Sequence, residues 1–332
     1  MENKRNALVD ITRVAAAAGI ILCHVDLSGY GAMGVLFGQF LSVRFSVMFF
    51  LAIIGFYVEK SCREGKGAAG KRVRSFLRVY GAWSLVYLAL SFVMSVLIQE
   101  VPVKLFLVSK VKGLLFSGSY YHFWFYPAVI YSLLFIGGVK KLLGDRTLHF
   151  LVPLALTLYV VGLLGTGYLP IGQKVPILRN FYGGEAFETV MHLFFLGFPS
   201  IVLGMAVAQK NGKCSGYLLL LAVAAYVSES MMLCMCFGWR ENPQMLISTP
   251  VLTMLFLKWV QNKNVQKKLN LTLLRVVSSG MYNVHPLFLA VFAVVIPNLN
   301  GLWTFLLCTV CSVVFGWMLH CFRKIKLIGM FV

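Results

Sequence analysis

One arginine and one histidine lie inside the first long apolar segment of the chain, in the run DITRVAAAAGIILCHV. Arg13 and His24 are separated by ten uncharged residues. On an α-helix these positions share one face, about 16 Å apart along the axis. Ionisable side chains within a membrane helix are costly in hydrocarbon and usually face a polar interior or a water-filled path. The pair therefore predicts a functional site, and a polar pair that satisfies neighbouring helices is the alternative.

The chemistry that suits this pair is proton transfer beside a bound anion. Imidazole is the natural general base for a hydroxyl group near neutral pH. If the N-terminus is cytoplasmic, a ligand that enters from the cytoplasm meets Arg13 first and His24 deeper in the helix. Asp10 lies one turn before Arg13 and is placed to orient it through an (i, i+3) pair. The alternative for Asp10 is a solvated acid at the entry of the helix.

The composition requires the elements that position these residues to be membrane helices. The chain has 332 residues, of which 59% are hydrophobic and 12% are charged, and this composition is far from that of a soluble domain. We expect a single polytopic domain over residues 1–332, an all-α bundle of about ten transmembrane helices. The expected spans are 9–29, 36–58, 79–98, 122–139, 148–165, 187–208, 215–236, 244–260, 276–297 and 301–321.

The strong basic charge is explained by membrane topology. With both termini in the cytoplasm, 22 of the 30 Lys and Arg residues fall on the cytoplasmic side and 6 on the opposite side. This asymmetry is the positive-inside signature, so a nucleic-acid partner is not expected. The expected location is the cell membrane, with the lipid bilayer as a partner.

Several segments resemble motifs of one known family, in that family's order. Arg13 and His24, preceded by Asp10, resemble the first-helix R-x10-H signature of the membrane-bound acyltransferase-3 family. FFLAIIGFYV is similar to its FFxxSGF segment, although Ile54 stands in place of the serine. KRVRSFLRVYGAW resembles its arginine-rich entry to the third helix, HFWFYPAVI its HLWFL segment, and MYNVHPLFL its late Y-x-x-H. The resemblance covers nearly the whole chain.

The resemblance implies an O-acyltransferase, which transfers groups other than aminoacyl groups. Members of the family move acyl groups, commonly acetyl, from cytoplasmic acyl-CoA to acceptors such as cell-envelope glycans. His24 would then act as general base on the acceptor hydroxyl, or accept the acyl group covalently. Arg13 would hold a phosphate or the pantetheine carbonyl. Acyl-CoA is the expected donor, and no metal is needed.

The basic segment before the third span is the expected dock for the CoA phosphates. Arg72, Arg74 and Arg78 offer planar donors that suit bidentate phosphate contacts, and Lys71 supports them. A positive-inside loop that touches lipid headgroups is the alternative. Tyr282 and His285 form an (i, i+3) pair that either lines the donor tunnel or bonds to a neighbouring helix.

Four further residues are candidates for contact with the substrate. His122 and Trp124 lie at the outer surface in YYHFWFYP, where they form an acceptor site or an interfacial aromatic belt. Glu229 is an acid deep in a late span, and His24 and Arg13 are its candidate partners. Arg44 either binds substrate or extends its side chain to the interface.

A second interpretation is binding or transport of a small molecule such as serine, without acyl transfer. The sequence is also similar to the membrane domain of vancomycin-resistance-type membrane serine racemases, where this domain is thought to handle serine delivery. Racemisation itself is not expected, because the 332 residues contain no racemase portion. A structural partner of envelope-synthesis enzymes is a third option.

Overall fold

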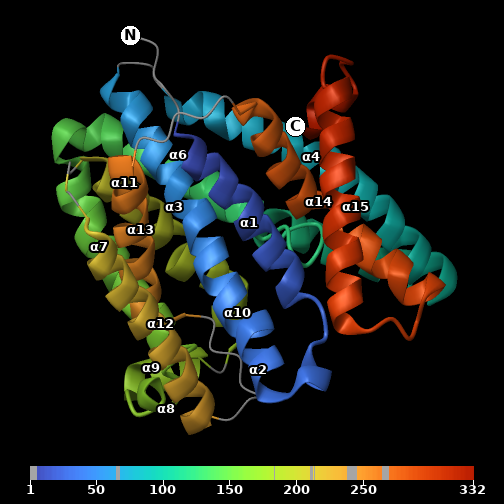
Figure 1. Ribbon diagram of the computed structural model, residues 1–332, viewed down its shortest axis with the longest axis horizontal. Helices are drawn as coiled ribbons and strands as arrows, with labels where there is room; N and C mark the ends of the chain where they lie inside the picture. The colour runs from blue at the N-terminus through green and yellow to red at the C-terminus, as the bar shows by residue number, and fades with distance from the viewer. Residues whose placement is uncertain are drawn as a thin grey trace. The chain divides into compact units, whose positions relative to one another are not determined.

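The computed structural model describes residues 6–64, 68–182, 184–209, 212, 214–237, 245–263 and 269–332, and every regular element in these ranges is helical. The chain forms two compact units. The first unit consists of Met1–Phe50, Asn211–Met330 and Val332, and the second unit of Leu51–Lys210 and Phe331. The expectation of an all-helical membrane protein is confirmed at this level (Figure 1).

The first unit combines the two ends of the chain. Its α-helices are α1 (Ala7–Cys23), α2 (Gly31–Val35), the start of α3 (Ser42–Arg63), α12 (Gly216–Phe237), α13 (Ser248–Lys263), α14 (Leu271–Val295) and α15 (Gly301–Phe322). A short 3-10 turn (Ser28–Tyr30) precedes α2, and a π-helical segment (Leu36–Leu41) leads from α2 into α3.

The second unit contains the rest of α3 and the middle of the chain. Its α-helices are α4 (Ala68–Phe92), α5 (Val103–Lys112), α6 (Phe125–Leu143), α7 (Thr147–Leu164), α8 (Leu169–Gly172), α9 (Pro176–Tyr182), α10 (Glu185–Val190) and α11 (Phe198–Gln209). π-helical segments extend α4 (Val93–Ile98), follow α5 (Gly113–Ser117) and join α10 to α11 (Met191–Gly197).

Helices α1 and α14 pack against each other in parallel and form the part of the first unit that carries the predicted catalytic residues. Ala17 and Ile21 of α1 share a buried cluster with Val277 and Met281 of α14 and with Cys308 of α15. Residue numbers rise together along both helices, so their N-termini lie at the same end. Both helices begin at an asparagine cap, which accepts a backbone N–H of the first turn.

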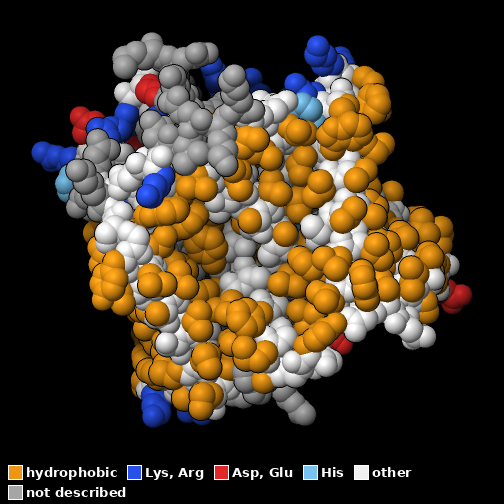
Figure 2. All heavy atoms as spheres, viewed as in Figure 1, with side chains coloured by type: hydrophobic (Ala, Val, Ile, Leu, Met, Phe, Trp, Pro, Cys, Tyr) orange, Lys and Arg blue, Asp and Glu red, His pale blue; other side chains and the backbone are white. Residues whose placement is uncertain are grey.

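Small residues let α15 approach α14 closely (Figure 1). A side chain on Gly280 would meet the backbone of Gly316 at 2.8 Å, and one on Gly316 would meet Val277 at 2.7 Å. Such contacts are typical of membrane helices, which associate mainly through close packing. The outward face of α15 is apolar, as Figure 2 shows, with Trp303, Val310 and Trp317 exposed. We interpret this face as a lipid contact.

In the second unit, α3 and α11 cross with their backbones in contact. A Cβ atom on Gly55 would lie 1.9 Å from the carbonyl oxygen of Ile201, and one on Gly204 would lie 1.7 Å from that of Ala52. No side chain fits at either position. The glycine of the FFLAIIGFYV motif therefore has a packing role in α3.

Seven described helical segments are long and apolar enough to cross a membrane. One of them, Phe125–Leu164, contains two expected spans, which the structure separates into α6 and α7 by a turn at Gly144–Arg146. Two other expected spans correspond to α1, with 17 residues, and α13, with 16 residues, both shorter than the roughly 20 residues that usually span a bilayer. The count of ten spans and the cytoplasmic placement of the termini stay predictions.

Candidate functional site

Arg13 is held at the N-terminal end of α1 by the acid one turn before it. Its Nη1 donates to the Asp10 carboxylate at 3.3 Å, and the two groups form an ion pair. The Asp10 side chain is 4% exposed and that of Arg13 is 18% exposed. The carboxylate thus fixes the guanidinium in a partly buried position, as the (i, i+3) spacing predicted.

His24 follows the last turn of α1, where its ring stacks on the ring of His285 from α14. The ring centroids are 5.2 Å apart and the planes are inclined by 22°. His285 is fully buried, whereas His24 is exposed. Two predicted site residues from distant parts of the sequence therefore meet, and the imidazole that ligands can reach is His24.

The proline after His285 explains how this buried ring is held. Pro286 has no N–H group, so the carbonyl oxygen of Tyr282, four residues earlier, lacks its usual helical donor. The Nδ1 atom of His285 lies 2.9 Å from that oxygen and 3.1 Å from the carbonyl oxygen of Met281. Since both partners are acceptors, Nδ1 carries the proton and Nε2 is the basic nitrogen. The helix thereby fixes both the tautomer and the orientation of His285.

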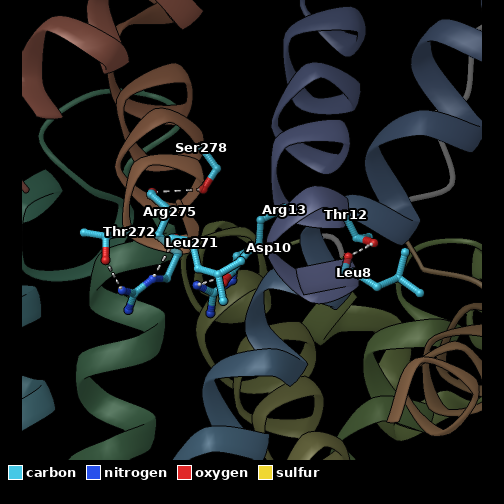
Figure 3. A network of polar contacts seen from close by, with 8 residues as sticks. All are labelled: Leu8, Asp10, Thr12, Arg13, Leu271, Thr272, Arg275 and Ser278. Atoms are coloured by element: carbon cyan, nitrogen blue, oxygen red, sulfur yellow. Dashed lines mark hydrogen bonds and ion pairs between the residues drawn. The ribbon is translucent and has the colours of Figure 1, made fainter. Parts of the chain in front are cut away.

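One residue of this site was missed by the sequence analysis. Arg275, counted there as a cytoplasmic charge, lies in the first turns of α14, where its Nε donates to the Leu271 carbonyl at 3.3 Å and its Nη2 to the Thr272 hydroxyl at 3.3 Å. Figure 3 shows the Arg13 and Arg275 guanidinium groups extending toward the same end of the α1–α14 pair. The signal that identifies Arg275 is its spacing of ten residues from His285, close to the eleven between Arg13 and His24.

The basic segment of the second unit is helical from Ala68 onward, so the candidate phosphate-binding residues lie on α4. The Arg72 guanidinium donates to the carbonyl of Tyr57 at 3.0 Å and to the hydroxyl of Ser61 at 3.2 Å, which ties α4 to α3. Lys71, Arg74 and Arg78 are exposed, and their spacing places them on one face of the helix. This face, rather than Arg72, is the exposed basic part of the segment.

An aromatic cluster in the second unit surrounds His122. This imidazole is 3% exposed and contacts the rings of Tyr87, Tyr120 and Phe123. Trp124, which is partly buried, packs on the ring of His192 with centroids 4.3 Å apart. His122 therefore belongs to the packed interior of this cluster, and Trp124 lies nearer the surface. A role for either residue in acceptor binding stays a prediction.

The two remaining candidates lie in the first unit. The Glu229 carboxylate accepts the backbone N–H groups of Ile247 and Ser248, both at 2.7 Å, and so holds the start of α13. Arg44 is 7% exposed, which does not fit a side chain that extends to the interface. Arg44 interacts electrostatically with Tyr226 of α12, whose hydroxyl donates to the carbonyl of Leu41 at 2.9 Å.

Comparison with curated proteins finds racemases among the relatives. An amino-acid racemase of Enterococcus faecalis is 24% identical over 96% of this chain and 46% of its own length. A serine/alanine racemase of Enterococcus gallinarum is 26% identical over 64% of this chain and 30% of its own length. The chain thus spans less than half the length of these relatives. No solved structure is significantly similar to it.

Comparison with protein families gives a match over nearly the whole chain. The profile of the acyltransferase-3 family, described as an acyltransferase domain, matches residues 6–321. The matched range includes every candidate site residue, from Asp10 to His285. The resemblance drawn from the ordered motifs is confirmed, and the chain belongs to the acyltransferase-3 family.

Proposed function

We propose that this protein is an integral-membrane O-acyltransferase that moves an acyl group from cytoplasmic acyl-CoA to a hydroxyl group. The preferred acyl group is acetyl, and the preferred acceptor is a cell-envelope glycan or a similar hydroxyl compound. The family supports the general activity. The acetyl group and the glycan acceptor follow from the resemblance to the family, and the arrangement of side chains along α1 and α14 supports CoA as the donor.

The observation that carries the proposal is the parallel α1–α14 pair, with arginines at one end and stacked imidazoles at the other. Arg13 and His24 are eleven residues apart, which corresponds to about 16 Å along the helix. In acyl-CoA, about 13 covalent bonds join the thioester sulfur to the nearest phosphorus, a reach of about 16 Å for an extended chain of ordinary bond lengths. A donor whose phosphates contact the arginines therefore brings its thioester to His24.

His24 is the general base in this mechanism. It takes the proton of the acceptor hydroxyl as the oxygen forms a bond to the thioester carbonyl carbon. The carbon–sulfur bond then breaks, and the CoA thiolate leaves and takes up a proton. In the alternative route, the imidazole accepts the acyl group and passes it on to the hydroxyl. His285 is a positioning residue that fixes the plane of the His24 ring through the stacking contact.

The other candidate residues have supporting roles in this proposal. Lys71, Arg74 and Arg78 attract the phosphates of the donor, because exposed cations on one helix face raise the local concentration of an anion. Tyr282 lies one turn before His285, its ring centroid 6.3 Å from that of the histidine, beside the path of the pantetheine arm. Trp124 contributes to acceptor binding, since sugar rings stack well on aromatic side chains, and the buried His122 supports the aromatic cluster beside it.

The test is the mass of the acceptor in cells. Envelope glycans from cells that express the protein should carry an added acyl unit, 42 Da for acetyl, that is missing without it. The His24→Ala variant should lose the modification while remaining in the membrane. The matched control is His149→Ala, which removes an exposed imidazole of α7 in the second unit. Unchanged acylation in the His24→Ala variant contradicts the mechanism.

A second candidate function is recognition or transport of an amino acid. It is favoured by the named relatives, which are racemases of amino acids, and by Arg44, a buried guanidinium able to bind a carboxylate. In this case, vesicles that contain the protein should accumulate labelled serine without consumption of CoA, and Arg44→Gln should abolish the uptake. Acceptor-dependent release of CoA without serine uptake rejects this candidate.

A further inference from the structure

Helix α5 of the second unit is rich in apolar residues and yet barely covered. Of its ten residues, eight are exposed, Lys110 is partly buried and Phe106 is buried. The exposed residues include five large apolar side chains, which are Val103, Leu105, Leu107, Val108 and Val111. A helix this short has little stability of its own in water, and a large exposed apolar surface usually marks a binding surface. The surface of α5 therefore requires an apolar environment.

Two contacts place α5 beside the segment of α4 that is long and apolar enough to cross a membrane, Gly70–Ile98. The ring of Phe106 packs on that of Phe92, with the ring centroids 5.6 Å apart. In the π-helical segment that follows α5, the carbonyl oxygen of Leu114 accepts the hydroxyl group of Tyr80 at 2.9 Å. Both partners on α4 belong to the membrane segment, so α5 and its extension run back along α4 at the depth of the bilayer.

The exposed apolar surface of α5 continues one on α4. The last turns before α5 also carry exposed apolar side chains, which are Val93, Met94, Leu97 and Ile98. A protein partner covers one face of a helix, whereas exposed residues of α5 lie on nearly every side of it. Acyl chains can surround a helix in this way. Lipid therefore fits this surface better than a second protein.

The charged residues of α5 are all lysines, at positions 104, 110 and 112. Lys104 is exposed, and the ammonium group of Lys110 lies 5.6 Å from the centroid of the Phe106 ring. An aromatic ring attracts a cation but does not neutralise its charge. Lysines at the depth of a bilayer extend their ammonium groups to the membrane surface, where lipid phosphates are the abundant anions. The charge of α5 is thus complementary to anionic headgroups.

We propose that α5 is a docking helix for anionic phospholipid. Its apolar side chains contact the acyl chains, and the ammonium groups of Lys104 and Lys110 bind the headgroup phosphates. Lysines that alternate with apolar residues are typical of helices that lie in the membrane interface. The docking does not depend on acyl transfer. It also anchors the segment that leads through Gly113–Ser117 to His122 and Trp124.

The experiment is photocrosslinking from α5 in the purified full chain. The variant Val108→p-benzoylphenylalanine places the reagent at an exposed position of α5, and the protein is held in nanodiscs of equal parts phosphatidylglycerol and phosphatidylcholine. Mass spectrometry of the labelled peptide should show phosphatidylglycerol adducts in excess. Lys104→Gln together with Lys110→Gln should lower the ratio of the two adducts about fivefold or more. The matched control, Lys174→Gln with Arg179→Gln, removes two exposed charges of the same unit and should leave the ratio unchanged.

Each outcome supports or overturns the docking of anionic lipid. An unchanged adduct ratio in the folded lysine variant, judged by an unchanged thermal midpoint, overturns it. An equal fall of the ratio in the control also overturns it, because the effect is then one of net charge alone. Crosslinks to a second copy of the chain in place of lipid show that α5 is a protein interface. If the double lysine variant does not fold, Lys104→Gln alone should lower the ratio about twofold, and no change in that variant overturns the proposal.

Discussion

The contact between His285 and the backbone of Tyr282 makes a testable prediction about stability. In α14 the side chain of His285 donates to the carbonyl oxygen that Pro286 leaves without a helical donor. Replacement of His285 by Ala removes this donor in a fully buried position. A second replacement, Pro286→Ala, supplies a backbone N–H in its place. The two substitutions should therefore be strongly coupled.

The size of the coupling follows from the hydrogen bond. A buried carbonyl that loses its partner costs about 1–3 kcal/mol. Removing the buried ring in His285→Ala costs about 2 kcal/mol or more in addition, by analogy with other large-to-small changes in a core. Pro286→Ala restores only the hydrogen bond to the Tyr282 carbonyl and not the packing of the lost ring. The effect of Pro286→Ala on the free energy of unfolding should therefore be about 1–3 kcal/mol more favourable in the His285→Ala protein than in the original protein.

The assay is a double-mutant cycle on the free energy of unfolding, measured by titration of the protein in mild detergent with a denaturing detergent. Four proteins are compared, namely the original, the two single variants and the double variant. A coupling energy near zero, below the usual non-additivity of about 0.5 kcal/mol for independent sites, refutes the reasoning. It would mean that the His285 ring does not replace the donor that proline lacks.

Two further predictions concern packing and helix ends. Gly204→Ala should strongly reduce the yield of folded protein, because the new Cβ atom would lie 1.7 Å from the Ala52 carbonyl oxygen. The control Gly138→Ala in α6, where a Cβ atom would have no other atom within 4 Å, should be neutral or slightly stabilising. Equal yields of the two variants contradict the backbone contact of α3 and α11. Glu229→Ala should speed amide hydrogen exchange at Ile247 and Ser248 about tenfold or more, since the carboxylate that accepts their N–H groups is lost. Glu229→Gln, which keeps one acceptor oxygen, should have a smaller effect. Unchanged exchange in both variants excludes the capping of α13 by Glu229.

Much of the fold was predictable because it depends on local patterns. The apolar runs predicted a helical membrane protein, and the (i, i+3) spacing of Asp10 and Arg13 predicted their ion pair. The ordered motifs predicted the family over residues 6–321. These features need only the period of a helix and the types of residue along it. No knowledge of how the helices pack is required.

The parts that were missed depend on the register between helices. Arg275 was counted with the cytoplasmic charges, because the positive-inside rule explains such a residue without any partner. Its place beside α1 follows only from the packing of Val277 and Met281. For Glu229 we had named His24 and Arg13 as candidate partners, whereas the structure shows its carboxylate at the backbone of α13. Backbone groups are partners that composition does not reveal.

The boundary between loop and helix was also misplaced in the basic segment. We expected the third span to start at residue 79, but the helix that contains it, α4, begins at Ala68 and includes the basic segment. Val73 and Tyr80 are buried, and Arg74 and Arg78 are exposed on the same helix. A helix can carry long basic side chains at the membrane edge, because their charged ends reach water while their stems cover apolar surface. A charge run therefore does not by itself mark a loop.

The central claim is that His24, at the end of the α1–α14 pair, acts as general base in the transfer of an acyl group from CoA. Its most direct test is the release of free CoA thiol from acetyl-CoA by the purified protein in nanodiscs, with and without an envelope glycan fraction as acceptor. The account predicts acceptor-dependent release by the original protein and by His149→Ala, and a loss of at least a hundredfold in His24→Ala, within the range usual for general base catalysis. Equal release by His24→Ala and the original protein would contradict it.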